Sequence, residues 1–257
     1  MFLWESIAFG PIHSRRLGSS LGINISPTDV KICSFDCIYC ECGWTLEKDI
    51  TSTHYATADI VAQAIEKKLQ SCQAEGTHID SITFSGNGES TLHPQFGEII
   101  DNLLILRDKY YSNAIITCLS NATKLQDVKV REALLKIENP MLKLDAGLPE
   151  LYQLINRPTI PVTMQDTVEG LRAFNGNFVM QSMFLKGEID GVKFDNTAEE
   201  NVAAWLKVLE EVKPRKVVLY SLDRETPAKQ LVKVHQPELE KIAERVKKIG
   251  IEAQFFE

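Results

Sequence analysis

The sequence alternates short apolar runs with longer segments of helical periodicity from Leu21 onward, and no linker, repeat or low-complexity tract interrupts the alternation. Short apolar runs predict buried strands, whereas apolar residues spaced three and four apart predict amphipathic helices. Consecutive strands that are joined by helices run parallel and are connected by right-handed crossovers. The six predicted strands are residues 21–25, 81–85, 114–119, 141–145, 178–185 and 216–220.

Helical periodicity marks the segments that lie between and after these runs. The predicted helices are residues 58–73, 96–111, 127–137, 163–174, 199–212 and 238–248. Thr57 and Thr197 are the predicted N-caps of the first and fifth helices. Pro237 at its start and Gly250 just beyond its end delimit the last helix.

Six strand–helix units are too few for a closed eight-stranded barrel, which usually needs about 250 residues of its own. The prediction is therefore an α/β fold: a partial (βα)6 TIM-like barrel with parallel strands. We expect one domain over residues 1–257, with an N-terminal extension (1–20), a cysteine loop (28–43) and a short C-terminal strand (251–257). In such folds the functional groups lie at the carboxyl ends of the strands.

The cysteine loop directly follows the first predicted strand and carries Cys33, Cys37 and Cys40 at a C-x3-C-x2-C spacing, with Tyr39 before the third cysteine. A [4Fe–4S] cluster normally takes four protein thiolates. Three thiolates would leave one iron open for a substrate or cofactor, as in catalytic zinc sites. The alternative is a closed four-thiolate zinc site that includes Cys42.

Further polar motifs occupy the ends of the next two strands. The second strand ends in FSGNGES, whose glycines allow a sharp turn and close approach to a ligand, while Glu89 supplies a negative charge. The third strand ends at Ser120 and Asn121, for which a capping or turn role is the alternative. Cys72 and Cys118 lie outside the loop and are predicted core residues.

The cysteine spacing with its preceding aromatic residue resembles the cluster loop of the radical S-adenosylmethionine (SAM) enzymes. FSGNGES resembles the Gly-Gly-Glu-Pro motif of that family, from which it departs at Asn87 and Ser90. Together with GPIHSRRLG, YCECGW, LKLDAG and YSLDRETP, these motifs resemble small single-cluster members related to the tRNA wyosine-base synthases. The match can be followed along nearly the whole chain.

The resemblance implies that Cys33, Cys37 and Cys40 hold one [4Fe–4S] cluster whose open iron binds SAM. It also implies reductive cleavage of SAM to methionine and a 5′-deoxyadenosyl radical, which abstracts hydrogen from a substrate. A one-electron donor such as flavodoxin or ferredoxin is then a partner. The implied SAM contacts are Tyr39, Gly86, Asn87, Gly88, Glu89, Ser120, Asn121, Gln181 and Met183.

Two groups of charged residues are candidates for catalysis or substrate recognition. In the fourth strand, Lys143 and Asp145 share one face, which we expect to point into the barrel; a structural ion pair is the alternative. The second group combines residues near the N-terminus with the end of the sixth strand, because arginine pairs suit phosphate or carboxylate. Its members are Arg15, Arg16, Tyr220, Asp223 and Arg224, and solvated loop charges are the alternative.

Composition narrows the substrate without identifying it. With 28 basic and 35 acidic residues, the formal charge is −7, so the chain lacks the broad basic footprint of a nucleic-acid-binding protein. A tRNA base stays possible but is not favoured by charge, and a small metabolite or a peptide segment is equally compatible. The alternatives are a glycyl-radical-type activase acting on a partner protein and a non-catalytic zinc or redox module with four cysteine ligands.

The sequence also bears on cellular location. Its start does not combine a basic region with an apolar core, so we expect no signal peptide. No uninterrupted apolar run approaches the length needed to cross a membrane. We therefore expect a cytoplasmic protein that does not act in a membrane.

Overall fold

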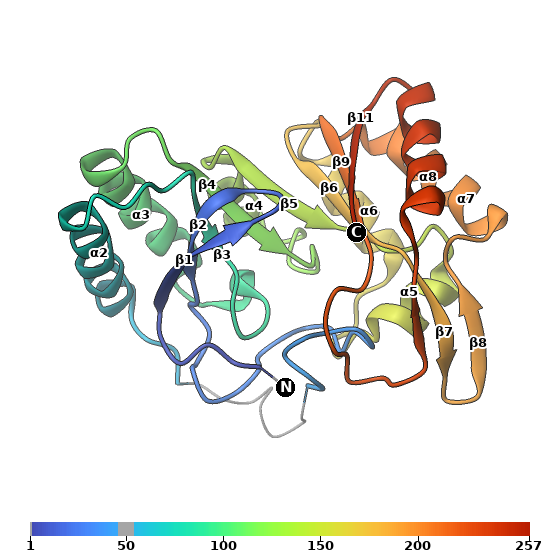
Figure 1. Cartoon of the computed structure of the whole chain (residues 1–257), viewed down its shortest axis with the longest axis horizontal. Helices are drawn as coiled ribbons and strands as arrows, with labels where there is room; N and C mark the ends of the chain where they lie inside the picture. Colours follow the sequence, from blue (N-terminus) through green and yellow to red (C-terminus); the bar gives the residue numbers. More distant parts are fainter. Residues whose placement is uncertain (1, 46–53) are drawn as a thin grey trace.

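The computed structural model describes residues 2–45 and 54–257. Its main sheet contains β1 (Ala8–Ser14), β2 (Gly18–Ile23), β3 (Ser81–Phe84), β4 (Ile115–Ser120), β5 (Asn139–Lys143), β6 (Val179–Met183), β9 (Lys216–Tyr220) and β11 (Glu252–Phe256), in that spatial order. Neighbouring strands from β2 to β11 run parallel, and β1 pairs antiparallel with β2 at one edge. The sheet curls into an open half barrel (Figure 1).

Helices connect the parallel strands and lie around the outside of the curved sheet (Figure 1). They are α2 (Ala58–Ala74), α3 (Phe96–Tyr110), α4 (Val128–Leu135), α5 (Pro149–Asn156), α6 (Met164–Arg172), α7 (Glu199–Val212) and α8 (Gln236–Lys248), with a short 3-10 helix, η1 (Ser90–Leu92). Six crossovers carry the chain from β2 to β11, which confirms the predicted partial (βα)6 barrel. The short helix α5 was not predicted.

Two apolar clusters show how the sheet is buried on both faces. The larger cluster fills the space between the strands and the helices and includes Leu142 and Leu144 of the β5 segment, together with Cys72 and Cys118. The smaller one contains Met141, Val179 and Val218. Since successive strand residues point to opposite faces, Met141 and Lys143 face the inside of the barrel, as predicted. Burying each large apolar side chain contributes roughly 1.5–3 kcal/mol.

The N-terminal segment, which was predicted only as an extension over residues 1–20, contains a strand. Residues 8–14 form β1, and the first parallel strand begins at Gly18 instead of Leu21. Pro11 cannot donate a hydrogen bond and is tolerated because β1 is an edge strand, and the register shifts between Phe9 and Ile12. These irregularities conceal the alternation by which a strand is recognised.

Two other predictions are corrected. The predicted strand 178–185 is divided: β6 ends at Met183, and the chain continues into β7 (Leu185–Ile189), which joins β8 (Val192–Asp195) and β10 (Leu231–Lys233) in a second sheet. The prediction that Thr197 caps α7 is wrong, because the N-cap is Ala198 and the Thr197 hydroxyl bonds Asp195. Among the described residues, none of the helices has the length and apolarity to cross a membrane.

Candidate functional site

The cysteine loop is attached at its start to the glycine motif that follows β3. The Ile32 N–H donates to the Asn87 carbonyl and the Glu89 N–H to the Ile32 carbonyl, each at 2.9 Å. Gly88 lies between these bonds at a φ of +135°, and a Cβ there would lie 1.7 Å from the Ile32 oxygen. Only glycine fits this close approach, so the second glycine of FSGNGES positions the cysteine loop.

The middle of the loop is attached to α5. The Asp36 N–H donates to the Asn156 carbonyl at 3.0 Å, and the Ile38 N–H donates to the Ile155 carbonyl at 3.1 Å. Helix α5 begins at Pro149, which suits a first helical turn. Its last turn therefore supplies the acceptors that hold the loop segment between the first and third cysteines.

These attachments bring the cysteines to a cavity of about 220 Å³ at the carboxyl ends of the strands, which we call the cysteine cavity. Its lining combines thiols, both lysines of the region and the strand-end motifs. It consists of Arg16, Lys31, Cys33, Cys37, Tyr39, Cys40, Cys42, Gly86, Gly88, Glu89, Leu119, Ser120, Asn121, Lys143, Gln181 and Tyr220. The structure thus brings most of the predicted cluster and SAM residues together.

Two lysine amines lie beside the thiols. Lys143 Nζ donates to Cys37 Sγ at 3.1 Å, while Lys31, whose side chain is only 2% exposed, donates to the Gly43 carbonyl at 2.7 Å. Burial raises the pKa of the Cys33 thiol to about 12 and also raises that of Cys37; Lys31 and Lys143, respectively, oppose these shifts. The two lysine amines therefore favour the thiolate forms, whereas burial of the cysteines disfavours them.

Cys40 and Cys42 interact with each other. The interaction with Cys42 lowers the pKa of the Cys40 thiol, and the same interaction raises the pKa of Cys42 far above its ordinary value. Cys42 Sγ also lies 3.6 Å from the Gly86 carbonyl oxygen. Cys42 is therefore expected to stay a thiol, whereas the thiolate is favoured at Cys40.

Tyr39 and Lys143 share a buried carboxylate. Asp145 accepts a hydrogen bond from the Tyr39 hydroxyl, from Asn156 Nδ2 at 2.7 Å and from the Met183 N–H at 2.9 Å. Lys143 Nζ lies 3.6 Å from Asp145 and donates to the Tyr39 hydroxyl at 2.9 Å. Lys143 and Asp145 therefore meet as expected, and their contacts also fix the Tyr39 ring.

Glu89 joins the ends of β3 and β4. Its Oε1 accepts from Thr91 and from the Ser120 hydroxyl at 2.9 Å, whereas its Oε2 accepts from the Asn121 N–H at 2.6 Å. Asn121 Nδ2 in turn donates to Ser34 at 2.9 Å, within the cysteine loop. Each carboxylate oxygen offers two lone pairs. Among the described residues, Oε2 accepts only from the Asn121 N–H, so it can accept one further hydrogen bond.

Not every predicted SAM contact reaches this cavity. The Asn87 side chain is completely buried elsewhere, where it bonds both backbone groups of Trp4 and donates to the Pro27 carbonyl at 3.0 Å. Met183 lines the neighbouring pocket instead of the cysteine cavity. Asn87 therefore holds the N-terminal segment against the glycine motif, and only its backbone borders the cysteine loop.

The residues present can be tested against the predicted cofactor. Among residues 2–45 and 54–257, no three His, Cys, Asp or Glu side chains are grouped as ligands of a single metal ion. Cys33, Cys37 and Cys40 nevertheless line one cavity together with two buried cationic amines. In a [4Fe–4S] cluster each cysteine thiolate binds a different iron, and the cluster together with its thiolates is negatively charged. The donor set and the positive surroundings therefore fit such a cluster.

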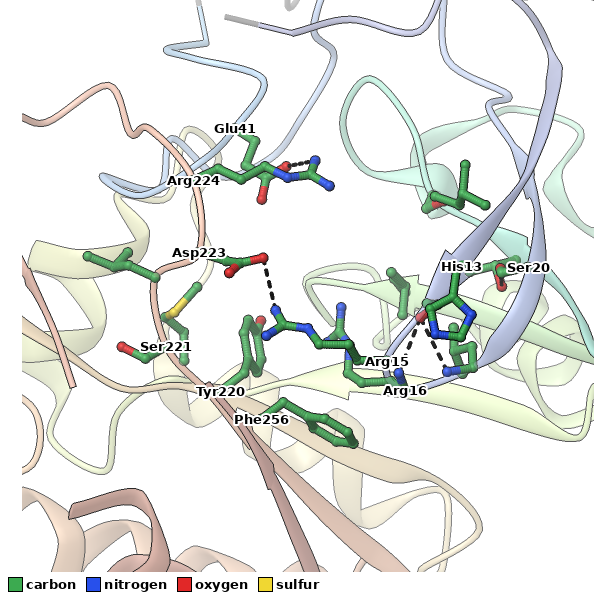
Figure 2. Close-up of a pocket in the computed structure, with 18 of the residues that line it drawn as sticks. His13, Arg15, Arg16, Ser20, Glu41, Tyr220, Ser221, Asp223, Arg224 and Phe256 are labelled. Atoms are coloured by element: carbon green, nitrogen blue, oxygen red, sulfur yellow. Dashed lines mark hydrogen bonds and ion pairs between the residues drawn. The ribbon is translucent and has the colours of Figure 1, made fainter. Parts of the chain in front are cut away.

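A second pocket of about 370 Å³, which we call the arginine pocket, adjoins the cysteine cavity. Arg16, Tyr39, Leu119 and Tyr220 line both spaces. Figure 2 shows the second group of predicted candidates around this pocket, with Arg15 and Arg16 approaching from the β1–β2 turn and Tyr220 from the end of β9. The structure thus brings the tip of the β1–β2 hairpin to the end of β9.

Ion pairs connect the walls of the arginine pocket (Figure 2). Arg15 Nη2 lies 2.9 Å from Asp223, and Arg224 Nη1 lies 2.7 Å from Glu41 in the cysteine loop. The Arg16 guanidinium lies over the Tyr220 ring, 5.0 Å from its centroid. Burial raises the pKa of Tyr220 to about 12, so its hydroxyl stays protonated at neutral pH.

Sequence reasoning did not identify several residues of the site. Lys31 was not singled out, although a lysine directly before a buried cysteine motif is a usable signal. Asn156 belongs to the unpredicted helix α5, and Asn156 Nδ2 reaches within 3.7 Å of Cys37 Sγ. Glu41 pairs with a residue 183 positions away, which no local pattern indicates.

Comparisons with known proteins agree with this geometry. Residues 29–205 match the radical SAM superfamily. A UPF0026 protein of Methanocaldococcus jannaschii is 31% identical over 214 residues, which cover 83% of this chain and 63% of that protein. The chain thus spans less than two thirds of the length of this relative.

Solved structures show the same fold. A radical SAM methyltransferase from Sphaerobacter thermophilus matches with a TM-score of 0.66 and 15% identity, over 92% of this chain and 65% of that chain. TYW1 with a lysine-pyruvate adduct bound matches with a TM-score of 0.64 and 15% identity, over 91% of this chain and 75% of that chain. The predicted relation to the wyosine-base synthases is therefore confirmed at the level of the fold.

Proposed function

Because the chain belongs to the radical SAM superfamily, we propose that Cys33, Cys37 and Cys40 hold one [4Fe–4S] cluster and that the rest of the cysteine cavity binds SAM. The observation that carries this proposal is the meeting of three thiols, two buried lysine amines and the glycine motif in one cavity. When bound, the cluster and SAM supply a one-electron cleavage that yields methionine and a 5′-deoxyadenosyl radical for hydrogen abstraction.

The protein's own residues then hold and orient the reactants. Lys31 and Lys143 balance the negative charge of the thiolates, and Lys143 also donates directly to Cys37. Asp145 and Lys143 lock the Tyr39 ring in one position at the cavity wall, where the ring can pack against adenine. The remaining acceptor capacity of Glu89 Oε2 suits the ammonium group of SAM.

The remaining proposed SAM contacts lie further along the strand ends. Ser120 and Asn121 follow β4, and Gln181 lies in β6, where its side-chain amide donates to the Met141 carbonyl at 3.2 Å. Met183, two residues beyond on the same face, lines the arginine pocket. We propose that this face would hold the adenosyl group of SAM, since its residues line both the cysteine cavity and the arginine pocket.

The arginine pocket is the proposed substrate site, since it shares a wall with the cysteine cavity. Its size fits a small molecule. Reductive cleavage of SAM consumes one electron, for which flavodoxin or ferredoxin is the proposed donor. The cytoplasm, where thiols stay reduced, is the proposed location. These assignments rest on the family and on the position of the pocket.

Anaerobic reconstitution with iron and sulfide tests the proposal. We expect a brown protein with about four irons per chain that forms 5′-deoxyadenosine when dithionite and SAM are added. Cys33→Ala should lose the iron, whereas Cys42→Ala should retain it, because only three thiolates are ligands. A colourless protein that binds one zinc, and loses it on Cys42→Ala, would establish the closed zinc module instead.

A further inference from the structure

Arg16 differs from the other arginines of the arginine pocket because it has no carboxylate partner. Arg15 pairs with Asp223, and Arg224 pairs with Glu41. Among the described residues, no carboxylate lies within ion-pair distance of Arg16, and its Nη1 atom is buried without a hydrogen-bond partner. The pocket therefore holds one uncompensated positive charge, in a chain whose formal charge is −7.

A buried guanidinium nitrogen without an acceptor is costly, because the N–H groups of Nη1 have left water without finding a partner. The surroundings of Arg16 hold the side chain in place all the same. Ser14 Oγ accepts from the Arg16 and Leu17 N–H groups at 3.3 and 3.2 Å, which fixes the hairpin turn, and the Tyr220 ring supports the guanidinium plane. Such a preorganised, unsatisfied donor group is suited to a ligand.

We propose that Arg16 binds a carboxylate or phosphoryl group of the substrate, which makes the substrate of this enzyme a small anionic molecule. The identification of the bound anion as the substrate rests on the proposed function. The anion site itself does not require the cluster. A planar guanidinium fork matches both carboxylate and phosphate in a bidentate manner.

The position of Arg16 defines how the substrate lies. Arg16 lines both the cysteine cavity and the arginine pocket, so an anionic group held there lies at the boundary between them. The ion pairs of Arg15 and Arg224 neutralise the rest of the wall (Figure 2). One anionic group is therefore recognised, and the remainder of the substrate occupies the largely uncharged volume near Leu119 and Met183.

The same chemistry has a second possible source, since SAM carries a carboxylate. The test therefore measures two bindings on the full, cluster-loaded chain. The first measurement is the Tm in inorganic phosphate, compared with the Tm in chloride at the same ionic strength. The second is the dissociation constant of SAM, which is measured by equilibrium dialysis. The variants are Arg16→Gln, Arg16→Lys and the control Arg245→Gln, whose partly exposed arginine pairs with Glu199 and does not line the pocket.

We expect phosphate at about 50 mM to raise the Tm of the wild type and of Arg245→Gln by about 3 °C or more. Arg16→Gln should lose this shift, keep its SAM dissociation constant within about twofold, and show a Tm without phosphate no lower than that of the wild type, because an unsatisfied charge is removed. If phosphate still stabilises Arg16→Gln, or if its SAM affinity falls tenfold, the proposal is overturned.

Arg16→Lys keeps the inference testable if the glutamine variant does not fold. It retains the charge but loses the planar fork, so its phosphate shift should be less than half that of the wild type. An undiminished shift would refute recognition by the guanidinium. The iron content of each variant is measured in parallel, so that failure of the cluster assignment is distinguished from failure of the anion site.

Discussion

Replacement of Gly88 by alanine tests whether the glycine motif positions the cysteine loop. An alanine Cβ would lie 1.7 Å from the Ile32 oxygen, and the backbone φ of +135° is one that L-residues rarely adopt. The loop would have to move away and give up the two backbone hydrogen bonds of Ile32, each 2.9 Å long. Gly76→Ala is the matched control, because Gly76 also has a positive φ, +66°, but nothing lies within 4 Å of its added Cβ.

The expected loss of stability differs between the two variants because the surroundings of Gly88 and Gly76 differ. Backbone strain at Gly88 costs about 2 kcal/mol, and the two lost hydrogen bonds cost about 1 kcal/mol each, so Gly88→Ala should lower the free energy of unfolding by about 4 kcal/mol. Gly76→Ala should cost only about 1 kcal/mol of strain. The difference corresponds to about 6–12 °C in Tm for a chain of this size.

Urea denaturation of the cluster-free protein, followed by circular dichroism, measures both variants without any contribution from metal. Iron content after reconstitution is a second measurement, and we expect Gly88→Ala to retain less iron than Gly76→Ala because its cysteine loop is displaced. If the two variants unfold within about 1 kcal/mol of each other, the close approach of Gly88 to Ile32 does not stabilise the fold and the reasoning is refuted.

Two further predictions concern buried groups. Asp145→Asn should lower the free energy of unfolding by about 3 kcal/mol, because it leaves Lys143 buried without its charge partner. The control Asp190→Asn removes an exposed ion pair and should cost less than about 1 kcal/mol. Equal losses of the two variants in urea titrations would contradict the value for Asp145→Asn. Burial lowers the pKa of His93 below its ordinary value, and Nδ1 accepts from the Gln95 N–H. The unfolded chain therefore binds this proton more readily, so stability falls as the pH drops below about 6.5; His93→Gln should reduce that fall, and an unchanged pH dependence would refute it.

The barrel could be predicted from the sequence because its signals are periodic. Each parallel strand is an apolar run, and each crossover is an amphipathic helix, so the order of elements follows from residue spacing. The rule that functional groups follow the strands then placed Cys33, Glu89, Asn121 and Lys143 at one end of the sheet, where the structure brings them together.

The features that were missed depend on contacts between distant parts of the chain. Glu41 and Arg224 are 183 positions apart, and their ion pair forms because the folded chain brings the cysteine loop to the end of β9. Asn87 occupies a motif position that predicts a ligand contact, yet its amide meets the Trp4 backbone, which arrives from the N-terminal segment. Local patterns carry no information on such partners, so only the folded structure reveals them.

The attachment of the cysteine loop also affects the order in which the holoprotein is assembled. Small zinc domains are unfolded until the metal arrives, because binding supplies their folding energy. Here, backbone bonds from Ile32 to the glycine motif and from Ile38 to α5 attach the loop to the scaffold through its main chain and not through the thiols. We therefore expect that removal of iron leaves a scaffold that accepts a new cluster without refolding.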